Sequence, residues 1–93
     1  MPASTGTAKT DHASKYLQQL CKHWSHKFTV EFDPTQGTVP FSDTAKVHFK
    51  ALDGKLEMDL SAESDERLEH LKKVVDDHLK RFAFREELQI DWS

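Results

Sequence analysis

Hydrophobic residues recur at helical spacing in two segments of the chain. In the first segment, from Asp11 to Lys27, the apolar positions three and four residues apart are Ala13, Leu17, Leu20, Cys21 and Trp24. This spacing predicts an amphipathic helix with Thr10 or Asp11 as its N-cap. In the second segment, from Ser64 to Phe84, an apolar stripe at helical spacing contains Leu68, Leu71, Val75 and Phe82. The pattern therefore predicts two helices that each bury one face.

Between these two helices, apolar and polar residues alternate in four short segments, which is typical of strands with one buried face. The four segments cover residues 28–32, 39–41, 45–50 and 56–60. A turn-forming segment follows the first strand at residues 33–37, and Pro40 places the second strand at an edge or a bulge. Asp53-Gly54 between the last two segments is a strong signal for a tight hairpin.

The hairpin predicted at Asp53-Gly54 has a register that the charges support. A two-residue turn pairs Lys50 with Glu57, His48 with Asp59, Phe49 with Met58 and Val47 with Leu60. One face of the hairpin is then apolar, and the other carries charges of opposite sign on neighbouring strands. Helices should therefore cover one face of the sheet while water covers the other.

The two ends of the chain differ in pattern. Residues 1–9 are small and polar without periodicity, so we predict a disordered tail there. Leu88, Ile90 and Trp92 alternate with polar residues, which predicts a short terminal strand or an extended clasp. Residues 10–93 are therefore predicted to form a single two-layer α+β domain in the order α-β-β-β-β-α, with a four-stranded antiparallel sheet, two helices on one face and a C-terminal extended segment.

The composition narrows the possible partners and the cellular location. The 93 residues include 13 Lys and Arg against 16 Asp and Glu, a formal net charge of −3, without a basic block. Nucleic acid and anionic membrane surfaces are therefore not expected as partners, because both require a positive field. The single cysteine cannot form an internal disulfide, and an apolar leader segment is not found after the N-terminus. Both facts favour the cytoplasm.

His78 falls within the apolar stripe of the second predicted helix, where a polar ring needs a hydrogen-bond partner. In one interpretation it is a core residue bonded to a backbone carbonyl or to Tyr16. In the other it contacts a ligand in a groove between the two helices. That predicted groove contains Tyr16, His23, His78, Arg81 and Arg85. The two arginines would hold a small anion through charge-assisted hydrogen bonds.

The segment around Cys21 combines one thiol with two imidazoles. On a helix, Cys21 and His23 point about 200° apart around the axis, so they cannot bind one metal ion together. His23 and His26 could share an ion, with His78 as a further candidate, but zinc requires three or four ligands. We therefore favour no metal or cofactor. Cys21 lies toward the apolar side of its helix, so core packing is a better interpretation than a nucleophile.

Two stretches of the sequence resemble a known bacterial family. They are residues 16–27 (YLQQLCKHWSHK) and residues 78–86 (HLKRFAFRE). They resemble the domain of unknown function 2218 family, and the resemblance extends from the first helix through Trp92. It implies no activity and no catalytic residue. It does imply a link with bacterial iron or siderophore uptake through neighbouring or fused genes.

Three functional hypotheses follow. The leading one is a non-catalytic binding or accessory module that uses the groove for a small anionic ligand. The second is a metal-dependent or redox enzyme that uses His23, His26, His78 or Cys21. The third is a structural domain that recruits a protein partner, or dimerises, through a sheet edge. The chain is expected to be a monomer or a homodimer.

Overall fold

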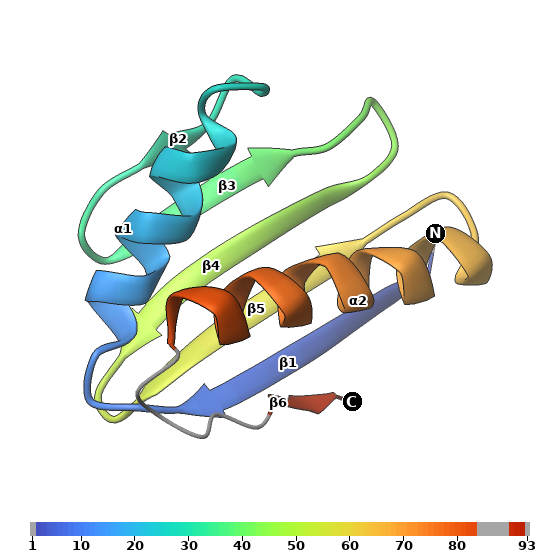
Figure 1. The fold of residues 1–93 in the computed structure, drawn as a ribbon. Coiled ribbons are helices and arrows are strands. Elements are labelled where there is room, and N and C mark those ends of the chain that lie inside the picture. Colours follow the sequence, from blue (N-terminus) through green and yellow to red (C-terminus); the bar gives the residue numbers. More distant parts are fainter. Residues whose placement is uncertain (1, 84–89, 93) are drawn as a thin grey trace.

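The computed structural model describes residues 2–83 and 90–92, which form a sheet covered on one face by two helices (Figure 1). The strands are β1 (Ala3–Lys9), β2 (Glu31–Phe32), β3 (Gln36–Pro40), β4 (Lys46–Leu52), β5 (Lys55–Ser61) and β6 (Ile90–Trp92). The helices are α1 (Ala13–Trp24) and α2 (Asp65–Phe82). The sheet is antiparallel with the strand order β2-β3-β4-β5-β1-β6. The predicted α+β class is confirmed, but the sheet has six strands where four were predicted.

The predicted disordered tail is wrong, because most of residues 1–9 form β1. This strand lies between β5 and β6, and each of its residues has a partner on β5, from Ala3 opposite Ser61 to Lys9 opposite Lys55. Its buried positions hold small side chains. A Cβ added to Gly6 would lie 2.5 Å from Cζ3 of Trp92, so a larger residue would collide with that ring. Hydropathy misses this strand because large neighbours, and not β1 itself, supply the apolar surface.

The C-terminal segment adds the sixth strand. β6 pairs with the part of β1 from Gly6 to Ala8, as the prediction of a short terminal strand requires. Nζ of Lys72 on α2 lies 5.8 Å from the centre of the Trp92 ring, a cation–π distance. Leu88, the first residue of the predicted segment, lies outside the described residues.

The predicted β4–β5 hairpin is confirmed residue by residue. Lys50 lies opposite Glu57 and Phe49 opposite Met58, with His48–Asp59 and Val47–Leu60 pairing as predicted. Gly54 has a φ of 73°, which the tight turn requires and which a residue without a Cβ adopts at little cost. The hairpin therefore presents its apolar side to the helices and its charged side to water.

The first predicted strand, over residues 28–32, is shortened to Glu31–Phe32. The chain leaves α1 through a turn in which the backbone N–H of Phe28 donates to the carbonyl of Trp24 at 2.9 Å. Phe28 and Val30 then pack against the core from this loop without joining the sheet. The start of α1 also differs from the prediction: the N-cap is His12, and the Thr10 hydroxyl oxygen instead accepts the backbone N–H of His12.

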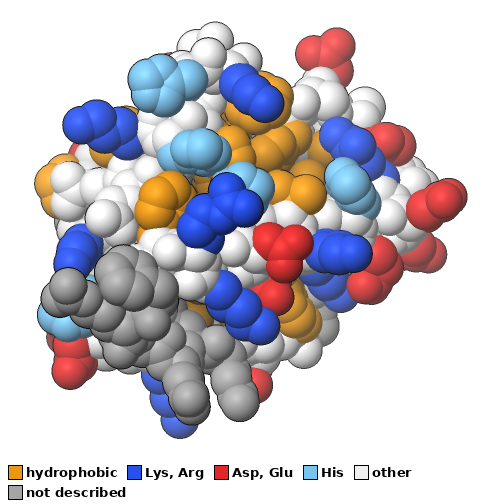
Figure 2. All heavy atoms as spheres, viewed as in Figure 1, with side chains coloured by type: hydrophobic (Ala, Val, Ile, Leu, Met, Phe, Trp, Pro, Cys, Tyr) orange, Lys and Arg blue, Asp and Glu red, His pale blue; other side chains and the backbone are white. Residues whose placement is uncertain are grey.

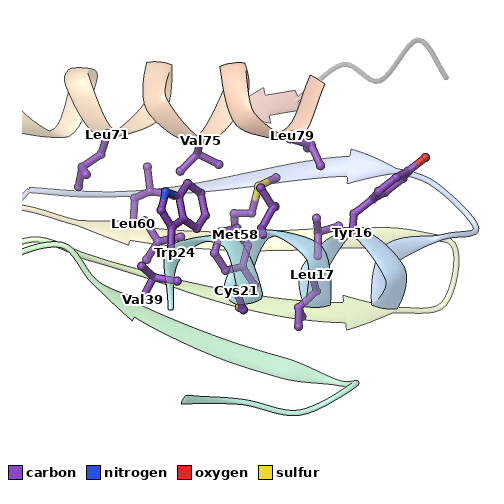
Figure 3. Packing of buried hydrophobic residues seen from close by; sticks show 14 of the residues in the cluster. Tyr16, Leu17, Cys21, Trp24, Val39, Met58, Leu60, Leu71, Val75 and Leu79 are labelled. Carbon is purple, nitrogen blue, oxygen red and sulfur yellow. The ribbon is translucent and has the colours of Figure 1, made fainter. Parts of the chain in front are cut away.

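The hydrophobic core fills the space between the helices and the sheet (Figure 3). From α2 it receives Leu71, Val75 and Leu79, and from α1 it receives Leu17, Cys21 and Trp24. The sheet contributes Val39, Val47, Phe49, Leu56, Met58 and Leu60. α2 begins after Ser64, whose hydroxyl accepts the backbone N–H of Arg67 and so caps the helix. In the part of the chain that the structure describes, neither helix is long and apolar enough to cross a membrane.

A substitution of Gly37 on β3 would test the contact between the sheet and α1. A Cβ at this position would lie 2.6 Å from Sγ of Cys21 and 2.7 Å from Cβ of Phe32. We expect Gly37→Ala to lower the free energy of unfolding by about 1–3 kcal/mol through overpacking, as measured by urea denaturation. Adding Cys21→Ala to this variant should restore part of the loss. Fully additive effects of the two substitutions would contradict the contact.

Candidate functional site

The two helices meet at the C-terminal end of α1, where several aromatic rings are in contact. The ring centroids of His23 and His78 are 5.3 Å apart, and those of Trp24 and His78 are 5.1 Å apart. The half-buried Phe82 ring lies 5.7 Å from His23. Two of the residues that the sequence assigned to the predicted groove, His23 and His78, are therefore neighbours.

A shallow hollow of about 320 Å³ opens beside these rings, and we call it the α1–α2 pocket. Its lining consists of His23, Trp24, His26, Lys27, Phe28, Phe41, Val74 and His78. Figure 2 shows histidine, basic and hydrophobic side chains gathered on this helix-bearing face of the molecule. The pocket thus combines aromatic walls with basic groups, and its lining contains no carboxylate among the described residues.

His78 lies at the margin of the apolar stripe rather than inside it. The buried residues of α2 are Leu68, Leu71, Val75 and Leu79, whereas His78 is half-buried. Its Nδ1 lies 2.7 Å from the carbonyl oxygen of Val74, so the hydrogen bond to a backbone carbonyl is confirmed. A carbonyl oxygen only accepts, so Nδ1 carries the proton and Nε2 of the neutral ring is an acceptor. This bond fixes the ring at the pocket wall.

His23 is exposed and has basic neighbours. Desolvation lowers the pKa of its imidazole, and the nearby His78, His26, Arg81 and Lys27 lower it further. Basic side chains also occupy the last turn of both helices, where the negative end of the helix dipole favours them. The neighbourhood of the pocket is therefore electropositive when its histidines carry protons.

The other members of the predicted groove lie elsewhere. Tyr16 is 4% exposed, two turns before His23 on α1, and its ring lies 6.3 Å from His12 in an edge-to-face arrangement. Arg81 is exposed and influences His23 without lining the pocket. Arg85 falls outside the described residues.

The sequence analysis missed the contributions of Trp24, Lys27, Phe28, Phe41 and Val74. Lys27 and Phe28 could have been assigned to the pocket from the sequence, because they directly follow the histidine-rich segment. Phe41 follows β3, far from that segment in the sequence, so no sequence pattern pointed to it.

The structure also bears on the predicted metal ligands and on the reactivity of Cys21. Within residues 2–83 and 90–92, no group of three His, Cys, Asp or Glu side chains is placed to hold a metal ion. Cys21 is fully buried, and burial raises the pKa of its thiol to about 12. Since the thiolate is the reactive form, Cys21 is a packing residue, as the sequence indicated.

The fold and the pocket define a small α+β domain with a basic and aromatic hollow between the ends of its helices. A model of the bacterial family described as "Uncharacterized protein conserved in bacteria (DUF2218)" matches residues 5–93, and the chain belongs to this family. The structure is similar to the NMR structure of PA4090 from Pseudomonas aeruginosa, with a TM-score of 0.83 and 39% sequence identity. That match covers 100% of this chain and 96% of the other. No curated protein matches the chain.

Proposed function

We propose that this protein is a non-catalytic binding module that holds a small anion in the α1–α2 pocket. The observation that carries the proposal is the composition of the lining: His23, His26, Lys27 and His78 supply cationic or hydrogen-bonding groups, and the lining contains no carboxylate among the described residues. Charge-assisted hydrogen bonds from such groups to an anion are shorter and stronger than neutral ones. The fixed His78 ring adds an orienting wall to the pocket.

Two features favour binding over catalysis. General acid–base catalysis pairs groups whose environments push their pKa values apart, whereas the groups that shift the pKa of His23 by charge are all basic. The thiol of Cys21, with its pKa of about 12, lies in the core and is unsuited to nucleophilic attack at neutral pH.

We place this module in the bacterial cytoplasm, where a single unpaired thiol is compatible with the reducing conditions. The family resemblance implies iron or siderophore uptake as a context, so an anionic iron chelate is one relevant class of ligand. Ferric citrate therefore belongs in the test panel beside acetate and inorganic phosphate. Among the residues that the structure describes, the edge strand β2 has two residues, which gives a second chain little backbone to pair with on that side of the sheet.

The proposal predicts that anions perturb the NMR signals of the Trp24 indole and the His23 and His78 rings. Replacing His23 with glutamine should weaken binding about tenfold or more, because a hydrogen bond to a charged group contributes about 1.5–3 kcal/mol. His70→Gln is the matched control, because His70 lies on α2 but lines a different hollow. If neither the anions of this panel nor an aromatic carboxylate shifts these signals, or if His70→Gln weakens binding equally, the α1–α2 pocket is not an anion site.

A further inference from the structure

We infer that the α1–α2 pocket takes a planar aromatic carboxylate, and that His23, beside His78, takes up a proton when this ligand binds. The inference rests on the proposed function and specifies it in two ways. The aromatic walls determine the body of the ligand, and the paired imidazoles determine how its charge is matched.

The aromatic walls are held in place by their own packing. The Trp24 ring is stacked on Phe49 at 6.0 Å and meets Phe41 edge-to-face at 5.2 Å. The Phe28 and Phe41 rings meet edge-to-face at 5.1 Å, and both are half-buried. Trp24 is only 4% exposed and supports the wall from behind, whereas the half-buried Phe28 and Phe41 offer ring surface to a ligand. A flat ring packs against such surfaces in stacked or edge-to-face geometry.

The same walls disfavour a compact inorganic anion. Phosphate in this pocket would lose hydration against Trp24, Phe28, Phe41 and Val74, which offer few hydrogen bonds in return. A carboxylate on an aromatic body can direct its charge toward the imidazoles while its ring covers the apolar side. A hollow of about 320 Å³ has room for a bicyclic aromatic acid. Because the pocket is shallow, we expect a Kd of about 1 mM.

The imidazole pair explains the proton uptake. Because the two ring centroids are 5.3 Å apart, a positive charge on His78 disfavours the protonated form of His23. His26 and Lys27 after α1 and Arg81 on α2 add to the repulsion at His23. Among the described residues, the sheet side of the pocket contributes Phe41 alone, and its ring is apolar.

A bound carboxylate reverses this balance. Its negative charge favours the imidazolium form, so the complex holds more protons than the free protein and the ligand. Because the pKa of His23 is lowered in the free protein, that ring is largely neutral at neutral pH and is available to take up a proton. Affinity should therefore rise as the pH falls, by at most about tenfold per pH unit for one proton.

The test uses isothermal titration calorimetry of the full chain with naphthoate, naphthamide and inorganic phosphate. Titrations at about pH 6 and about pH 8, in buffers with different ionisation heats, report both affinity and proton uptake. We expect naphthoate to bind more tightly than phosphate and naphthamide, to gain affinity at the lower pH, and to take up a proton. The His23→Gln/His78→Gln variant should lose the proton uptake, whereas His70→Gln should keep it.

The outcomes separate this inference from the proposed function. If phosphate binds as tightly as naphthoate, the aromatic ligand class is wrong while the anion site remains. If naphthoate binds with the same affinity at both pH values and without proton uptake, the role of the imidazole pair is wrong. If naphthamide matches naphthoate, the pocket is an aromatic site without anion preference. If neither anion binds, the inference and the proposed function both fail.

Discussion

Deletion of residues 1–9 should unfold the domain. β1 pairs along its whole length with β5 and holds β6 on its other side, so the deletion removes an interior strand. The buried face of β5, with Leu56, Met58 and Leu60, would lose its neighbour. We expect a loss of more than about 4 kcal/mol, which approaches the whole stability of a domain at the lower end of the roughly 5–15 kcal/mol range. Circular dichroism and thermal denaturation of the truncated chain would measure it.

Two point substitutions provide a matched control for this deletion. Ala8 is 0% exposed on the helix-facing side of β1, so Ala8→Lys would bury a charge and should cost about 3 kcal/mol or more. Thr7 lies on the open face between Glu57 and Asp91, so Thr7→Lys should change stability by only about 0.5 kcal/mol. A truncated chain with an unchanged melting temperature would contradict the place of β1 in the sheet.

Trp24→Ala should produce the second large effect, because Trp24 joins the core to the pocket. Its ring contacts Phe41, Phe49 and His78, and the residue is only 4% exposed. Removing a buried aromatic side chain costs about 3–5 kcal/mol, which corresponds to a fall in melting temperature of at least about 12 °C. Differential scanning calorimetry would give both quantities.

Two further variants distinguish the packing role of Trp24 from a general loss of hydrophobic area. Trp24→Phe should retain more of the stability than Trp24→Ala, because a smaller ring still fills part of the site. Phe82→Ala removes a half-buried ring at the edge of the same cluster and should cost less than Trp24→Ala. Equal losses for Trp24→Ala and Phe82→Ala would show that Trp24 is not the centre of this cluster.

The parts of the fold that periodicity specifies could be predicted from the sequence. Alternation fixed the β4–β5 register, since a shift by one residue would have moved Phe49 and Met58 to the charged face. β1 could not be found in this way, because Ser4, Gly6 and Ala8 are buried by virtue of their small size. Hydropathy identifies residues that are apolar, whereas Ser4, Gly6 and Ala8 are buried because only small side chains fit beneath their larger neighbours.

Helix periodicity allowed only part of the candidate site to be predicted from the sequence. His23 and His78 are close together, but Tyr16 lies about 10 Å from His23 along the axis of α1 although both occupy the same helix face. In Figure 1, α2 runs in a different direction from α1 and only its C-terminal end approaches α1, so the helices meet over a short length. The crossing angle depends on how the sheet supports both helices, and no local pattern encodes it. The position of Phe41 in the pocket lining likewise depends on tertiary packing and not on a local sequence pattern.

The position of β1 has a consequence for the order in which the fold can form. β1 precedes the other strands in the sequence, yet its partners lie far along the chain, with Ala3 opposite Ser61 and Thr7 opposite Asp91. β1 can therefore form its pairing with β5 only after β5 has been synthesised. β6 follows later still. Pairing over such sequence separations slows folding, so we expect β1 to join the sheet late.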